Sequence, residues 1–149
     1  MNIDNDEAGI VRLIPQKPPF VMVGKAICSD EMHTETEFYI RSDTIFVEDG
    51  FFREPGLIEN MAQTMAVRGG LARKSGDKKA QVGMIGAVKN FRCYRLPRMH
   101  TTIRTRIVLE GEILGAAMIR GAVFQADEKL AECEMKIFMK EDNENLYPG

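Results

Sequence analysis

One acidic side chain interrupts the apolar run LIENMAQTMA at residues 57–66, and this position has the clearest potential for acid-base chemistry. On a helical wheel, Glu59 lies beside Ala66 at the margin of the apolar stripe, and Gln63 follows one turn later along the same edge. A carboxylate that is partly removed from water can serve as a general acid or base. The alternative is structural, because a helix needs a polar face and an acidic residue in its first turn complements the helix dipole.

The preceding loop, DGFFREPG at residues 49–56, could supply a second kind of catalytic group. It places Phe51, Phe52 and a Pro-Gly turn directly before the expected helix. Backbone N–H groups in the first turn of a helix have no partners within it, so Gly56 could present one to a carbonyl oxygen or an oxyanion, with the two phenylalanines beside it. Ordinary turn chemistry is the alternative, since Pro-Gly pairs are common in turns.

The histidines and cysteines give weaker evidence for a catalytic or metal site than the helix start does. His33 and His100 lie in strand-like patterns, and neither belongs to a triad-like signature or has the further partners that a metal site needs. The three cysteines, Cys28, Cys93 and Cys133, are odd in number and far apart, which favours reduced, buried thiols over disulfides or a zinc site. We therefore expect no metal and no cofactor.

Two further groups of residues concern binding. Four basic residues gather in the segment KNFRCYRLPR: Lys89, Arg92, Arg95 and Arg98. They suit an acidic partner or a phosphate-bearing carrier, although a cluster of this size is usually solvated surface. Three methionines in or after the expected helix suit a deformable slot for an acyl chain or, more commonly, core packing: Met61, Met65 and Met84.

The elements that must position these residues follow from periodicity. Apolar residues at helical spacing predict one long helix at residues 56–74: Ile58, Met61, Ala62, Met65, Ala66 and Gly69. Pro55 and Gly76 stand at its two ends, as these residue types favour. Strand-like runs precede the helix at residues 20–28 and 32–40 and follow it at residues 82–91, 100–109, 114–125 and 130–139.

This order predicts an α+β fold, with an antiparallel sheet wrapped around a single central helix. The 149 residues fit one domain with an N-terminal arm at 1–12 and a polar tail at 141–149. A net charge of −2 gives no drive toward nucleic acid. The acidic start does not look like a secretion signal and no apolar run is long enough to cross a membrane, so we expect a cytoplasmic protein.

Three segments, in this order, resemble the FabA/FabZ-type β-hydroxyacyl-acyl-carrier-protein dehydratases. LIPQKPPFVMVGKA at residues 13–26 is similar to their opening Leu-Pro-His-x-x-Pro-Phe segment. PGLIENMAQTMA at residues 55–66 is similar to their helix start, and GAVKNFRCYRLP at residues 86–97 to the strand after it. Within the wider family, the helix start is most similar to divergent members found with aryl-polyene and related pigment-type clusters.

The resemblance implies a hotdog fold, a homo- or heterodimer with acyl tunnels at the subunit interface, and a reaction on an acyl-carrier-protein thioester or an acyl-coenzyme A. In these dehydratases a histidine of one subunit and a helix carboxylate of the other remove water, while a backbone N–H at the helix start polarises the thioester carbonyl. By position, Glu59 matches the carboxylate, Gly56 the helix-start glycine and Gln63 the following glutamine.

The chain departs from this pattern at both family histidines. Phe51 follows Gly50 where the catalytic histidine would stand, and Gln16 replaces the histidine of the opening segment. Without an imidazole, the usual division of acid and base work between two residues is lost. Three functions therefore remain open: a dehydratase of fatty acid or polyene-type biosynthesis that uses Glu59 with a substitute group, a hotdog thioesterase that uses Glu59, or a non-catalytic subunit that pairs with an active dehydratase.

Overall fold

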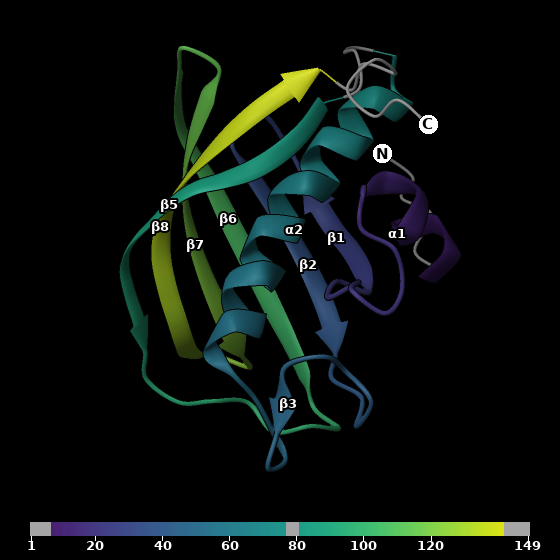
Figure 1. Cartoon of the computed structure of the whole chain (residues 1–149), viewed down its shortest axis with the longest axis vertical. Coiled ribbons are helices and arrows are strands. Elements are labelled where there is room, and N and C mark those ends of the chain that lie inside the picture. The colour runs from purple at the N-terminus through teal and green to yellow at the C-terminus, as the bar shows by residue number, and fades with distance from the viewer. Residues whose placement is uncertain (1–6, 77–80, 142–149) are drawn as a thin grey trace.

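The computed structural model describes residues 7–76 and 81–141, in which a curved antiparallel sheet surrounds one long helix, α2 (Figure 1). Six of the described strands form the sheet in the order β1-β2-β6-β7-β8-β5, and every neighbouring pair is antiparallel. Their bounds are β1 Lys25–Ser29, β2 His33–Tyr39, β5 Gln81–Cys93, β6 Thr102–Ile113, β7 Ala116–Gln125 and β8 Glu128–Glu141. The prediction of an α+β fold with the helix inside the sheet is confirmed.

Helix α2, Glu54–Lys74, begins at Glu54 rather than at Gly56. Pro55 fits the first turn because a backbone N–H there has no partner within the helix. An acidic residue in the first turn and basic residues in the last complement the helix dipole. Gly76 adopts a φ of +81° just after the helix, where it ends the chain's helical path.

The first sheet strand begins at Lys25, so the prediction of a strand from residue 20 is wrong for its first half. Prolines 18 and 19 lack the N–H that a central strand must donate, and residues 21–24 belong to no described strand. A short hairpin was missed altogether: β3, Val47–Glu48, pairs with β4, Phe51–Phe52, through a turn at Asp49 and Gly50, which both have positive φ.

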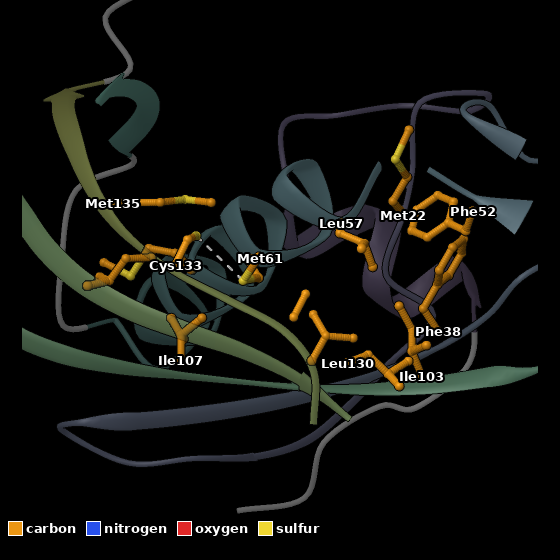
Figure 2. Close-up of a cluster of buried hydrophobic side chains, with 14 of the residues drawn as sticks. Met22, Phe38, Phe52, Leu57, Met61, Ile103, Ile107, Leu130, Cys133 and Met135 are labelled. Carbon is orange, nitrogen blue, oxygen red and sulfur yellow. Dashed lines mark hydrogen bonds between the residues drawn. The ribbon is translucent and has the colours of Figure 1, made fainter. Parts of the chain in front are cut away.

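The core fills the space between α2 and the sheet. Met22, Phe38 and Phe52 close one end of it, and Met61 and Cys133 lie near the middle with their sulfur atoms 3.8 Å apart (Figure 2). The predicted apolar stripe of the helix only partly faces this core: Met61 and Met65 are buried, whereas Ile58, Ala62, Ala66 and Gly69 are half-buried. The prediction of buried thiols is wrong for Cys28, which is exposed, and Cys93 is half-buried.

A second cluster joins the N-terminal part of the chain to the far half of α2. Helix α1, Glu7–Leu13, occupies the second half of the expected N-terminal arm, ends one residue beyond it, and packs beside α2 and β1 (Figure 1). Ile10, Ile14 and Val67 are buried in this cluster. The predicted polar tail begins at Glu141, which is the last residue of β8, and the rest of the tail lies outside the described residues.

Candidate active site

A cavity of about 350 Å³ opens between α2, the segment after α1, and strands β5 and β8. Its apolar lining comes from Ala62, Met65 and Ala66 of α2, Met84 and Ile85 of β5, and Ile137 of β8. Glu59 is the one carboxylate among its lining residues, and Gln16 is its other side chain with a polar head. Met65 and Met84 therefore line this space, as the idea of a deformable slot predicts, whereas Met61 belongs to the core.

The carboxylate of Glu59 is oriented by its neighbour one turn along the helix. The Gln63 Nε2 donates a hydrogen bond to Glu59 Oε1 at 2.9 Å, and Glu59 is half-buried. Gln63 itself is fully buried, and both ends of its carboxamide have hydrogen-bond partners. Its Oε1 accepts from the backbone N–H of Met22 at 2.7 Å, and its Nε2 also donates to the carbonyl of Phe20 at 2.8 Å. A carboxamide fixed at both ends leaves little freedom for the carboxylate bonded to it.

Other polar side chains of α2 are buried against the sheet. Asn60 donates to the carbonyl of Met22 at 2.6 Å and accepts from the hydroxyl of Thr105. Thr64 contacts the hydroxyl of Thr36 at 2.8 Å. All four side chains are less than 2% exposed. This network was not predicted from the sequence, although polar residues at core-facing helical positions were a signal for it.

At the helix start, Gly56 packs closely against the ring of Phe52. A Cβ at this position would come within 2.4 Å of the ring of Phe52, which is fully buried beneath it. The N–H of Gly56 donates to the carbonyl of Arg53 at 2.9 Å. Phe51 is half-buried with the Arg98 guanidinium 5.1 Å from its ring centre. Gly56, Phe51 and Phe52 do not line the cavity, and their roles in substrate binding stay predictions.

Neither histidine lines the cavity. His33, on β2, has its Nδ1 3.4 Å from a carboxylate oxygen of Asp30, and His100 is exposed with a φ of +66°. Within residues 7–76 and 81–141, no three histidine, cysteine or acidic side chains come together as a metal would require. The same described residues contain no helix long and apolar enough to cross a membrane.

The four basic residues of the segment 89–98 lie among acidic side chains. Arg95 makes a bidentate contact with the carboxylate of Glu128, with Nε donating to Oε1 and a terminal nitrogen donating to Oε2, and these hydrogen bonds lower the pKa of Glu128. In the sheet register, Lys89 lies opposite Glu134 and Arg92 opposite Glu132. Acidic residues therefore alternate with the basic ones on this surface, which weakens its positive field.

Comparison with known proteins gives one family match. The model of the ApeP-like family, described as ApeP dehydratase, matches residues 8–147. No curated protein matches the chain in sequence.

Solved structures share the arrangement of elements. The dehydratase heterocomplex ApeI:P from Xenorhabdus doucetiae superposes with a TM-score of 0.76 at 18% identity, over 92% of this chain and 94% of that one. The uncharacterized protein PH1136 from Pyrococcus horikoshii gives a TM-score of 0.66 at 13% identity, over 89% and 94% of the two chains. The PaaI protein of the E. coli phenylacetic acid degradation operon gives 0.60 at 10% identity, over 76% and 80%. The chain has the hotdog fold.

Proposed function

Because the chain belongs to the ApeP-like dehydratase family, we propose that it takes part in the dehydration of β-hydroxyacyl thioesters of the polyene or fatty acid type, with Glu59 as the reacting carboxylate. The observation that carries this proposal is the position of Glu59. It is a single carboxylate on the wall of an otherwise largely apolar cavity, held there by Gln63. An apolar wall suits the acyl chain, and a fixed carboxylate suits proton transfer.

Dehydration removes one proton from the carbon next to the thioester and the hydroxyl group from the following carbon, so that an enoyl thioester and water form. The carboxylate of Glu59 accepts the carbon-bound proton. The departing hydroxyl must gain a proton to leave as water, and in the dehydratases that this chain resembles a histidine and the helix carboxylate share the acid-base work. No imidazole lines the cavity among the described residues. We therefore infer that the second proton-transfer group comes from another chain.

Strand β5 is the surface that supports such a pairing. It lies at one end of the described sheet and pairs with β8 alone. Its apolar side chains are unusually exposed, with Met84 at 60%, Ile85 at 39% and Val88 at 37%. Met84 and Ile85 also line the cavity, so a second chain aligned along β5 would lie against its opening. The solved relative named above is itself a heterocomplex, and we propose the same kind of partner here.

The test is a dehydration assay on β-hydroxyacyl thioesters of an acyl carrier protein and of coenzyme A, with the chain alone and mixed with a histidine-bearing hotdog dehydratase subunit. Glu59→Gln should lower the rate by about a hundredfold or more, because the base is replaced by an amide that cannot take the proton. Glu112→Gln, on an exposed part of β6, serves as the matched control and should leave the rate unchanged.

The same assay separates the alternatives. A thioesterase would release free thiol without forming an enoyl product, and the release would depend on Glu59. A non-catalytic subunit would raise the activity of its partner equally well with glutamine at position 59. Either result would contradict the proposed role of Glu59 in dehydration.

A further inference from the structure

One buried polar atom beside the cavity has no hydrogen-bond partner among the described residues. Gln16 lines the same cavity as Glu59, and its Oε1 is shielded from solvent without any hydrogen bond to the residues that the structure describes. A buried carboxamide oxygen left unpaired is costly, so native proteins nearly always give such an atom a partner. Gln16 as a whole is only half-buried and lines the cavity, so a turn of its carboxamide would bring this oxygen to a bound molecule.

The backbone around Gln16 is held to α2 at two separate places. On one side, the carbonyl of Leu13 packs directly against Gly70 and accepts a hydrogen bond from Arg73 at 3.0 Å. On the other, Gln63 binds the backbone of residues 20 and 22. The ammonium of Lys17 also donates to the carbonyl of Val11 at 2.9 Å. Gln16 is therefore carried on a segment anchored before and after it, and its unpaired oxygen is not explained by a loose loop.

A carboxamide head offers both an acceptor oxygen and N–H donors. A hydroxyl group is its natural counterpart, because it too donates and accepts. The substrate of the proposed dehydration carries a hydroxyl on its acyl chain, whereas a saturated or enoyl chain carries none. Among the side chains that line the cavity, only Glu59 also has a polar head that could bind that hydroxyl.

We propose that Gln16 binds the β-hydroxyl of the acyl substrate and thereby discriminates hydroxyacyl thioesters from chains that lack the hydroxyl. This inference rests on the proposed function and assigns Gln16 as a specificity-determining residue of the same cavity. It also gives a role to the glutamine that stands where related dehydratases have a histidine in their opening segment.

The experiment compares two pantetheine amides of equal chain length, one with and one without the β-hydroxyl, because the amide replaces the reactive thioester. Binding to the full chain and to its complex with the partner is measured by calorimetry. Wild type should bind the hydroxylated compound about tenfold more tightly, since the saturated one leaves the carboxamide unpaired. Gln16→Met, which is similar in length and apolar, should abolish this ratio while keeping affinity for the saturated compound.

Gln125→Met is the matched control, because Gln125 bonds Thr101 outside the cavity, and it should preserve the ratio. The ratio separates recognition from folding, since a structural defect would weaken both compounds alike. A Gln16→Met protein that still prefers the hydroxylated compound tenfold would overturn the proposal. If wild type binds both compounds equally while dehydration depends on Glu59, only the role of Gln16 fails. If wild type binds neither and shows no dehydration, the proposed function fails with it.

Discussion

Two adjacent glycines of α2 predict opposite effects of one substitution. A Cβ on Gly70 would lie 2.0 Å from the carbonyl oxygen of Leu13 and 2.7 Å from its carbonyl carbon, and both are backbone atoms that cannot rotate aside. A Cβ on Gly69 would meet no atom within 4 Å. Alanine at position 70 must therefore push the end of α1 away from α2, whereas alanine at position 69 requires no movement.

The magnitudes follow from two terms. Replacing a helical glycine with alanine stabilises the helix by about 1 kcal/mol. Forcing backbone apart in a packed contact costs about 3 kcal/mol. We therefore expect Gly69→Ala to raise the free energy of unfolding by about 1 kcal/mol, from the helical term alone, and Gly70→Ala to lower it by about 2 kcal/mol, the difference of both terms. For a chain of this size, the separation of about 3 kcal/mol corresponds to roughly 6–12 °C in Tm.

Thermal and urea unfolding of the wild type and the two variants, followed by circular dichroism, provide the measurement. The paired design removes the helix-propensity term, because both variants carry the same change in neighbouring residues of one helix. If Gly70→Ala proves as stable as Gly69→Ala, the close contact between Leu13 and α2 does not exist, and the anchoring of Gln16 argued above loses one of its two supports.

Further predictions concern two buried carboxamides and two of the thiols. Asn60→Leu should lower the free energy of unfolding in urea by about 3 kcal/mol, because the hydroxyl of Thr105 and a backbone carbonyl lose their partner in the core; an unchanged midpoint would contradict this. Gln63→Leu should cost about 2 kcal/mol and reduce dehydration as well, since it frees both the preceding segment and the catalytic carboxylate. At about pH 8, a thiol reagent should modify Cys28 in the folded protein and Cys133 only after unfolding, because burial raises the pKa of Cys133 to about 11. The Cys28 reaction should keep accelerating above the usual thiol pKa, because burial and the nearby acidic side chains raise its pKa too; a plateau below that range would contradict this.

Much of the fold was accessible from the sequence because periodicity reports burial. The alternation of residues 32–40 placed Thr34, Thr36 and Phe38 on one face, and these are the buried residues of β2. Helical spacing located α2 to within two residues at its start. The pair of Glu59 and Gln63 could be recognised for the same reason, since residues four apart on a helix lie side by side.

The remaining features depend on contacts between distant parts of the chain. Nothing local to Gln16 indicates that it will reach the cavity of Glu59, because the anchors that bring it there lie some 40 to 60 residues further along the chain. The short hairpin at Val47–Phe52 also escaped notice, because its strands contain two residues each. The close packing of Phe52 beneath Gly56 also could not be read from the sequence.

Polar residues of α2 supply the hydrogen bonds that the neighbouring segment, residues 20–22, does not obtain from a strand. Residues 20–22 lie against the helix outside any strand, so their buried backbone groups need side-chain partners, and Asn60 and Gln63 provide them. Glu59 makes no such contact with that segment. The described residues give its carboxylate one hydrogen bond, from Gln63, although the two oxygens of a carboxylate can accept about four. The unused hydrogen-bonding capacity of the Glu59 carboxylate lies on the cavity wall. In Glu59→Gln, the amide oxygen could accept the same single hydrogen bond from Gln63. Glu59→Gln should therefore leave the free energy of unfolding nearly unchanged, which makes any loss of dehydration in that variant a measure of chemistry rather than of folding.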